Sequence, residues 1–150
     1  MRAARQPVFN APPGTLWLCL ALLIAYGLFV LAPARWQEWA VAHLAFVPAF
    51  FLAQFSAEGP GISAAGLAPL VTYMFLHGDL LHVVVNAGML LAFGALVERA
   101  IGTGRFLFLF FASGIAAAVV QALAVGPVLV AVVGASGGGY GMIGAGVRFL

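Results

Sequence analysis

Charged residues are scarce in this chain of 150 residues, and lysine is absent. Acidic and basic residues together make up 7% of the sequence, whereas a soluble domain carries about 25%. So little charge cannot cover a water-facing surface, and 65% of the residues are hydrophobic. The composition therefore excludes a soluble globular protein. It predicts a polytopic protein of the lipid bilayer.

Other scarcities exclude further classes. The six basic residues are all arginines spread along the chain, which excludes a nucleic-acid-binding patch. Cysteine occurs once, as Cys19, so no disulfide can form within the chain. No acidic residue lies inside the apolar stretches described below, which disfavours a transporter or channel that relays protons or ions.

Four apolar stretches are long enough to cross a bilayer, which takes about 17–25 helical residues. They are residues 16–32, 80–97, 106–125 and 128–147. The alternating polarity of barrel strands is absent. We therefore predict an all-α membrane helical bundle with four transmembrane helices.

A fifth apolar stretch, residues 40–55, is short and contains Pro48, which interrupts a helix. If this stretch does not cross and the N-terminus is cytoplasmic, five of the six arginines face the cytoplasm and only Arg35 lies outside. The positive-inside rule favours this arrangement over five spans, which would put four arginines outside. An N-terminal signal peptide is the alternative, but the first apolar run exceeds the usual length of about 7–15 residues.

These counts predict a short cytoplasmic N-terminus over residues 1–15 and a membrane domain over residues 16–150. Within that domain, residues 33–79 form a long outer loop that embeds partly in the membrane surface. Trp36 and Trp39 suit the interfacial aromatic belt just after the first span.

Polar side chains inside spans are functional candidates by default. His82 and Asn86 are four residues apart, so they share one helix face, about 6 Å apart along its axis. Ser136 lies in the fourth stretch at a similar depth, nearer the outer surface. The three side chains can therefore meet at one site.

Glycines crowd the chain around Ser136. Gly134/Gly138 and Gly137/Gly141 are small-xxx-small pairs, which allow close helix contact. Each glycine also costs a helix about 1 kcal/mol relative to alanine, so we expect a turn at Gly134 that leads into a helix with Ser136 near its N-terminus. Helix N-terminal N–H groups there would stabilise an oxyanion. The alternative is that Ser136 is a small packing residue, with His82 and Asn86 as interhelical hydrogen-bonding groups.

In sequence order, these motifs resemble the rhomboid intramembrane serine proteases. The resemblance covers about residues 67–150, and the motifs are specific together although each is weak alone. They are His82-Val-Val-Val-Asn86, then Glu98-Arg99 with Gly102 and Gly104, then Gly134-Ala-Ser136-Gly137 with Tyr140 and Gly144.

The resemblance implies a role for each matching residue. Ser136 is the expected nucleophile, and His82 and Asn86, with the Ser136 N–H, are the expected oxyanion donors. Gly134 is the expected motif glycine, with Gly137 beside the nucleophile. The family uses a Ser–His dyad without metal or cofactor.

Two further histidine-related expectations follow from the same resemblance. Tyr140 is expected to pack against the catalytic histidine. His77 resembles a loop histidine that often precedes the H-x-x-x-N motif, and an ordinary surface loop residue explains it equally well.

Two departures from the family pattern matter. Ala68-Pro69 stands where the family often has Trp-Arg. The family core has six spans, with the catalytic histidine on the sixth, so we interpret this chain as an N-terminal fragment with the first four spans. Residues 1–150 alone are then expected to be inactive.

The sequence thus predicts an intramembrane serine endopeptidase that cleaves transmembrane protein substrates, with its histidine beyond residue 150. The alternative is a non-catalytic rhomboid-like protein that binds membrane clients, which the retained Ser136 disfavours. The Ala- and Gly-rich composition, with arginine in place of lysine throughout, suggests a bacterial plasma (inner) membrane, and an organelle membrane is the alternative.

Overall fold

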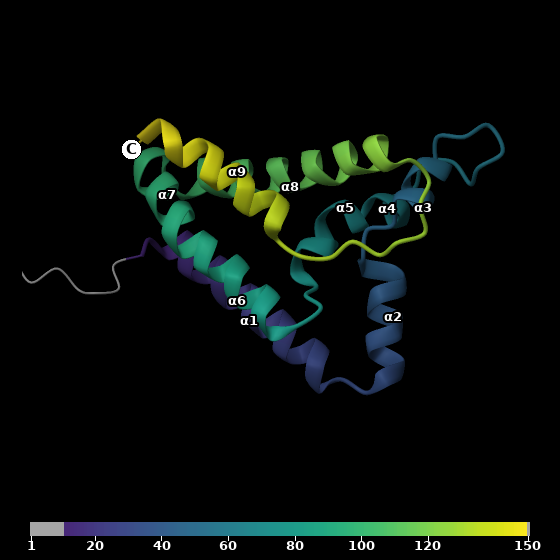
Figure 1. The fold of residues 1–150 in the computed structure, drawn as a ribbon, viewed down its shortest axis with the longest axis horizontal. Helices are drawn as coiled ribbons and strands as arrows, with labels where there is room; N and C mark the ends of the chain where they lie inside the picture. Colours follow the sequence, from purple (N-terminus) through teal and green to yellow (C-terminus); the bar gives the residue numbers. More distant parts are fainter. Residues whose placement is uncertain (1–10, 150) are drawn as a thin grey trace, which may run out of the picture.

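The computed structural model describes residues 11–149, and over that range the chain is an all-α bundle without strands (Figure 1). Three helical segments are long and apolar enough to cross a membrane: α1 (Pro13–Leu31), Leu80–Ile101 and α8 (Thr103–Val125). These confirm the first three predicted spans and the all-α class. The predicted cytoplasmic N-terminus falls mostly on residues 1–10, outside the described residues.

The second span is one continuous helix with a change of geometry in its middle. It consists of α6 (Leu80–Met89), the π-helical η2 (Leu90–Gly94) and α7 (Ala95–Ile101). Asp79 caps its N-terminus by accepting a 2.8 Å hydrogen bond from the His82 N–H. Gly102, at φ 84°, ends it.

The fourth predicted span, residues 128–147, is wrong as a continuous helix. Residues 126–135 contain no helix, and only α9 (Ser136–Gly146) and the short η3 (Val147–Phe149) are helical. Gly134 has φ 111°, a conformation that glycine alone adopts readily. The predicted turn at Gly134 that leads into a helix is therefore confirmed.

Residues 33–79 fold into short helices joined by turns. In chain order these helices are α2 (Ala34–Leu44), α3 (Pro48–Ala53), α4 (Ala64–Leu67), α5 (Pro69–Thr72) and η1 (Tyr73–Phe75). Pro48 occupies the first position of α3, where its missing N–H costs nothing. Figure 1 shows α2 standing apart from the bundle of long helices.

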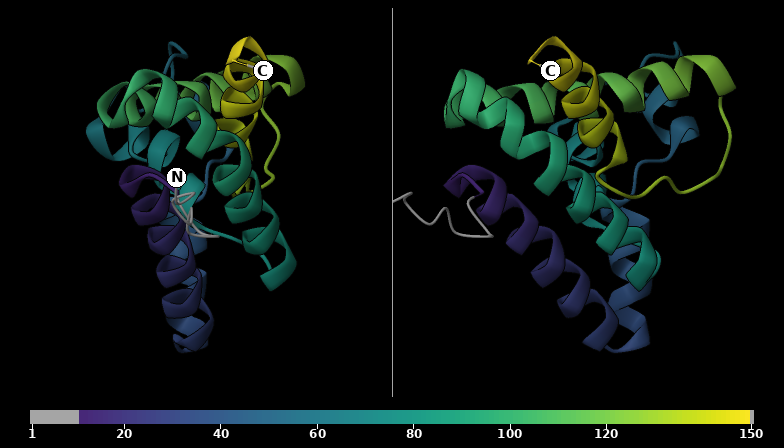
Figure 2. Two further views of the ribbon diagram at one scale, coloured as in Figure 1. Left: turned by 90° about the vertical axis from the view of Figure 1, so that its left-hand side faces the viewer. Right: turned by 60° about the vertical axis from the view of Figure 1, so that its left-hand side comes forward.

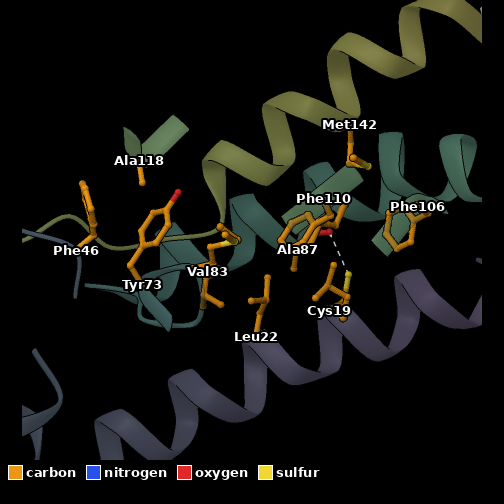
Figure 3. Packing of buried hydrophobic residues seen from close by; sticks show 14 of the residues in the cluster. Cys19, Leu22, Phe46, Tyr73, Val83, Ala87, Phe106, Phe110, Ala118 and Met142 are labelled. Atoms are coloured by element: carbon orange, nitrogen blue, oxygen red, sulfur yellow. Dashed lines mark hydrogen bonds between the residues drawn. The ribbon is translucent and has the colours of Figure 1, made fainter. Parts of the chain in front are cut away.

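The core lies where α1, α6, α8 and α9 meet. Figure 2 shows α1 and α6 running alongside each other beneath α8 and α9. Figure 3 shows side chains from all four helices in one cluster, which also receives residues from the loop region. The labelled members are Cys19, Leu22, Phe46, Tyr73, Val83, Ala87, Phe106, Phe110, Ala118 and Met142.

Glycines let α9 approach α8 closely. A Cβ at Gly137 would lie 2.7 Å from Ala117 Cβ, and a Cβ at Gly141 would overlap the Ser113 side chain. The Gly137/Gly141 pair thus acts as a helix contact, as predicted. Gly134 precedes the helix, so the pairing of Gly134 with Gly138 as a helix-contact motif is wrong.

Glu98 ties the far end of the second span to its neighbours. It is 3% exposed and accepts hydrogen bonds from the Gly14 N–H (2.9 Å), the Thr15 N–H (2.6 Å), the Thr15 hydroxyl (2.8 Å) and the Thr103 hydroxyl (2.7 Å). Two of these donors are N–H groups in the first turn of α1, where a negative charge is favourable. The carboxylate therefore links α7 to the starts of α1 and α8.

Candidate active site

His82 and Asn86 lie on α6 and face the turn that precedes Ser136. A Cβ at Gly134 would lie 2.5 Å from His82 Nε2 and 3.5 Å from Asn86 Nδ2. Only a residue without a side chain fits there, and the strained φ of Gly134 adds to that requirement. Both side chains therefore converge on one backbone position, two residues before Ser136.

Ser136 is the first residue of α9. The helical hydrogen bonds begin with the Gly139 N–H, which donates to the Ala135 carbonyl oxygen at 2.9 Å. The N–H groups of Ser136 and Gly137 lie ahead of this bond, as at any helix N-terminus. The predicted position of Ser136 at a helix N-terminus is confirmed, and the local backbone can stabilise a negative charge beside its hydroxyl.

Backbone pairing holds the extended segment before Ser136 in register. Phe46 and Val132 exchange two hydrogen bonds, of 3.0 Å and 2.7 Å, in an isolated antiparallel bridge. The Gly134 N–H donates to the Tyr73 carbonyl oxygen at 2.9 Å. Phe46 and Tyr73, from the region of short helices over residues 33–79, thus fix where the turn lies relative to α6.

Three buried nitrogen atoms in α6 and the loop just before it lack hydrogen-bond partners among the described residues. They are Asn86 Nδ2, in a side chain 2% exposed, and both ring nitrogens of His77, which is 1% exposed. Most buried polar atoms in proteins are paired, and exceptions gather where water or a ligand binds. The cluster is therefore suited to donate hydrogen bonds to a group from outside the chain.

His77 lies against His82, with ring centroids 4.9 Å apart in an edge-on arrangement. Its interpretation as a surface loop residue is wrong, because the side chain is buried. Burial, together with the nearby His82, lowers the pKa of His77 to about 4. His77 is therefore neutral at physiological pH.

One face of α9 is open. Tyr140 follows Ser136 by one helical turn and is 67% exposed. Gly144, a further turn along, has no atom within 4 Å of where its Cβ would lie. The expected contact of Tyr140 with a histidine is not made by the described residues. Among residues 11–149, no group of three or more His, Cys, Asp or Glu side chains is placed to hold a metal ion.

Comparison with known protein families identifies the part of the chain that contains these residues. Residues 64–149, more than half of the chain, match the family model of the rhomboid domain. The chain belongs to the rhomboid family. Together with its three apolar helices, this membership makes it an integral membrane protein.

A curated relative also matches part of the chain. This rhomboid is 36% identical over 89 residues to Rhomboid-like protease 3 from Toxoplasma gondii, and the alignment covers 59% of this chain and 33% of the relative. The chain therefore spans about a third of the length of the relative it matches.

Sequence reasoning missed one residue that positions the site of this rhomboid. Tyr73 is 3% exposed, and its hydroxyl donates to the Gly114 carbonyl oxygen of α8 at 2.8 Å while its own carbonyl holds Gly134. Burial raises the pKa of Tyr73 to about 12, so the hydroxyl stays a donor. No local pattern marks Tyr73, because both of its partners are distant in sequence.

Proposed function

We propose that this rhomboid is part of an intramembrane serine endopeptidase in which Ser136 is the nucleophile. One observation carries the proposal: His82 and Asn86 converge on the turn that delivers Ser136 to a helix N-terminus, and the Asn86 amide nitrogen has no partner among the described residues. A packing serine would not require buried donors kept unpaired beside it. An oxyanion would use them.

The proposed reaction begins when the Ser136 hydroxyl attacks the carbonyl carbon of an unwound substrate segment. A C–O bond forms as a general base takes the hydroxyl proton; the tetrahedral intermediate then collapses, the peptide C–N bond breaks, and the base passes the proton to the leaving amine. His82, Asn86 and the Ser136 N–H stabilise the oxyanion. Water then hydrolyses the acyl-enzyme and releases Ser136.

The general base in this proposal is a histidine beyond residue 150. The open face of α9 supports it, because Ser136, Tyr140 and Gly144 lie along that face and Gly144 leaves room for another helix. His82 does not serve as the base, since its proposed role is to bind the oxyanion. The proposed catalytic pair is thus Ser136 with this histidine.

The proposed substrates are transmembrane helices of membrane-anchored proteins. The three membrane-length helices support this, because a site among them would be within reach of helices in the same bilayer. We further propose the bacterial plasma membrane as the location, supported by the Ala- and Gly-rich composition in which arginine is the only basic residue type besides histidine.

The test uses the full-length protein in liposomes with a membrane-anchored reporter substrate. Ser136→Ala is expected to abolish cleavage and labelling by a fluorophosphonate probe. Ser113→Ala is the matched control, because Ser113 is a membrane serine that packs against Gly141. A wild-type protein that neither cleaves nor takes the probe at Ser136 would instead support a non-catalytic protein that binds membrane clients.

A further inference from the structure

A groove of about 350 Å³ separates the C-terminal half of α1 from α2. Leu28 and Phe29 line it on α1, Trp39 and Leu44 on α2, and Phe75 and Leu76 on the loop side. On each helix the lining residues recur at helical spacing, so an apolar face of α1 and an apolar face of α2 line the groove. The volume lies within the usual range for a small-molecule site, about 300–1,000 Å³.

Two polar side chains at the groove are already satisfied. The Thr72 hydroxyl, which faces the groove, donates to the Leu44 carbonyl oxygen at 2.8 Å. At the turn between the helices, the Gln37 side-chain amide donates to the Ala32 carbonyl oxygen at 2.9 Å. The groove therefore offers a water molecule little to bind, and an apolar occupant fits it better.

A cation lies beside the groove. Arg35 is in the first turn of α2, directly after α1 ends, and its guanidinium carbon lies 5.7 Å from the centroid of the Trp36 ring, which lines the groove. Within residues 11–149 this guanidinium makes no hydrogen bond or ion pair. Because α1 is long enough to span the bilayer, Arg35 lies at the membrane surface. A guanidinium at that depth binds phosphate oxygens in a two-pronged geometry.

We propose that one acyl chain of a membrane phospholipid fills this groove and that the lipid phosphate pairs with Arg35. The helix α2 has no buried residue of its own, so it needs a partner to cover its apolar face. The lipid also braces the chain near the candidate site. Phe46, which bridges Val132 two residues before Gly134, lies only two residues beyond the end of α2.

The test uses the full-length protein in nanodiscs that contain phosphatidylglycerol with a diazirine in one acyl chain. After irradiation, mass spectrometry is expected to locate the label on groove residues of α1, α2 and η1. Ala40→Trp, which fills the groove from α2, should reduce that labelling at least about tenfold, because the chain can no longer bury its methylenes there. Ala116→Trp, at an exposed alanine of α8, is the matched control and should leave the labelling unchanged.

Arg35→Gln tests the headgroup contact without altering the groove. It should weaken labelling about fivefold at limiting lipid, the usual effect of one basic side chain near an anionic surface. Unchanged labelling in Ala40→Trp would overturn the proposal, as would equal labelling of the outer face of α8 or a crosslink from the groove to a second protein chain. Unchanged labelling in Arg35→Gln would overturn the pairing with phosphate.

Discussion

Two buried polar clusters lie toward opposite ends of the helix Leu80–Ile101, and they differ in how their hydrogen bonds are completed. Glu98, at one end, accepts four hydrogen bonds from α1 and the start of α8. Asn86 and His77, at the other, hold nitrogen atoms that nothing in the described chain satisfies. Burial is nearly equal, at 3% exposed for Glu98 and 2% for Asn86. Burial alone therefore does not distinguish the two clusters, whereas the completeness of their hydrogen bonding does.

The difference has an energetic meaning. An unsatisfied buried donor costs about 1–3 kcal/mol, whereas each hydrogen bond to a charged group contributes about 1.5–3 kcal/mol. The Glu98 cluster thus adds to stability, while the Asn86 cluster reduces it unless a ligand arrives. The variants below are ordered by the size of the effect that this contrast predicts.

Replacing Glu98 should have the largest effect on stability. Glu98→Ala removes four hydrogen bonds at once, so the free energy of unfolding should fall by at least about 4 kcal/mol. Steric trapping in bicelles measures this quantity. Glu58→Ala, at an exposed loop carboxylate, is the control and should change little. A loss as small as that of the control would show that Glu98 does not hold α1 and α8 in place.

Replacing Asn86 should separate activity from stability. Asn86→Ala removes an unpaired buried donor, which stabilises the fold, and leaves a small cavity, which destabilises it, so the free energy of unfolding should change by less than about 1 kcal/mol. In the proposed reaction the same change should lower turnover by about 10²–10³, the usual effect of losing one oxyanion donor. Cleavage of the reporter by the full-length protein measures this loss.

Two further variants sharpen the Asn86 result. Asn86→Asp keeps the shape of the side chain but replaces the N–H donor with an oxygen, so it should be as slow as Asn86→Ala. Val85→Ala, at a position 51% exposed on the same helix, should leave turnover unchanged. If Asn86→Ala cleaves as fast as the wild type, Asn86 does not bind the oxyanion.

Local patterns in the sequence were sufficient for the long helices and for the turn at Gly134. Apolar runs of membrane length predicted three spans, because a helix in lipid must satisfy its own backbone. The density of glycine predicted the break before Ser136. The i, i+4 spacing of His82 and Asn86 correctly placed them on one face, since that spacing depends only on helix geometry.

Tertiary contacts decided the rest. Residues 128–133 are apolar enough to belong to a span, yet they run extended because their backbone pairs with residues of the 33–79 region, as in the bond from the Ala49 N–H to the Val128 carbonyl oxygen at 3.1 Å. The burial of His77 and the double role of Tyr73 also depend on segments far away in the chain. Hydropathy reports apolarity, and it does not report which segments meet.

His77 should give the smallest effect, visible as a pH dependence of stability. Its folded pKa of about 4 lies below the ordinary value of 6.5, so between these pH values the unfolded chain binds a proton that the folded chain does not. The free energy of unfolding should therefore fall as the pH drops from 6.5 toward 4, with a slope of at most about 1.4 kcal/mol per pH unit from this group. His77→Phe should flatten the profile measured by steric trapping, whereas His43→Gln, at an exposed histidine, should retain it. Equal slopes in wild type and His77→Phe would mean that a partner already stabilises the protonated form of the buried imidazole. His77 would then be satisfied, as Glu98 is, and would not differ from it in this respect.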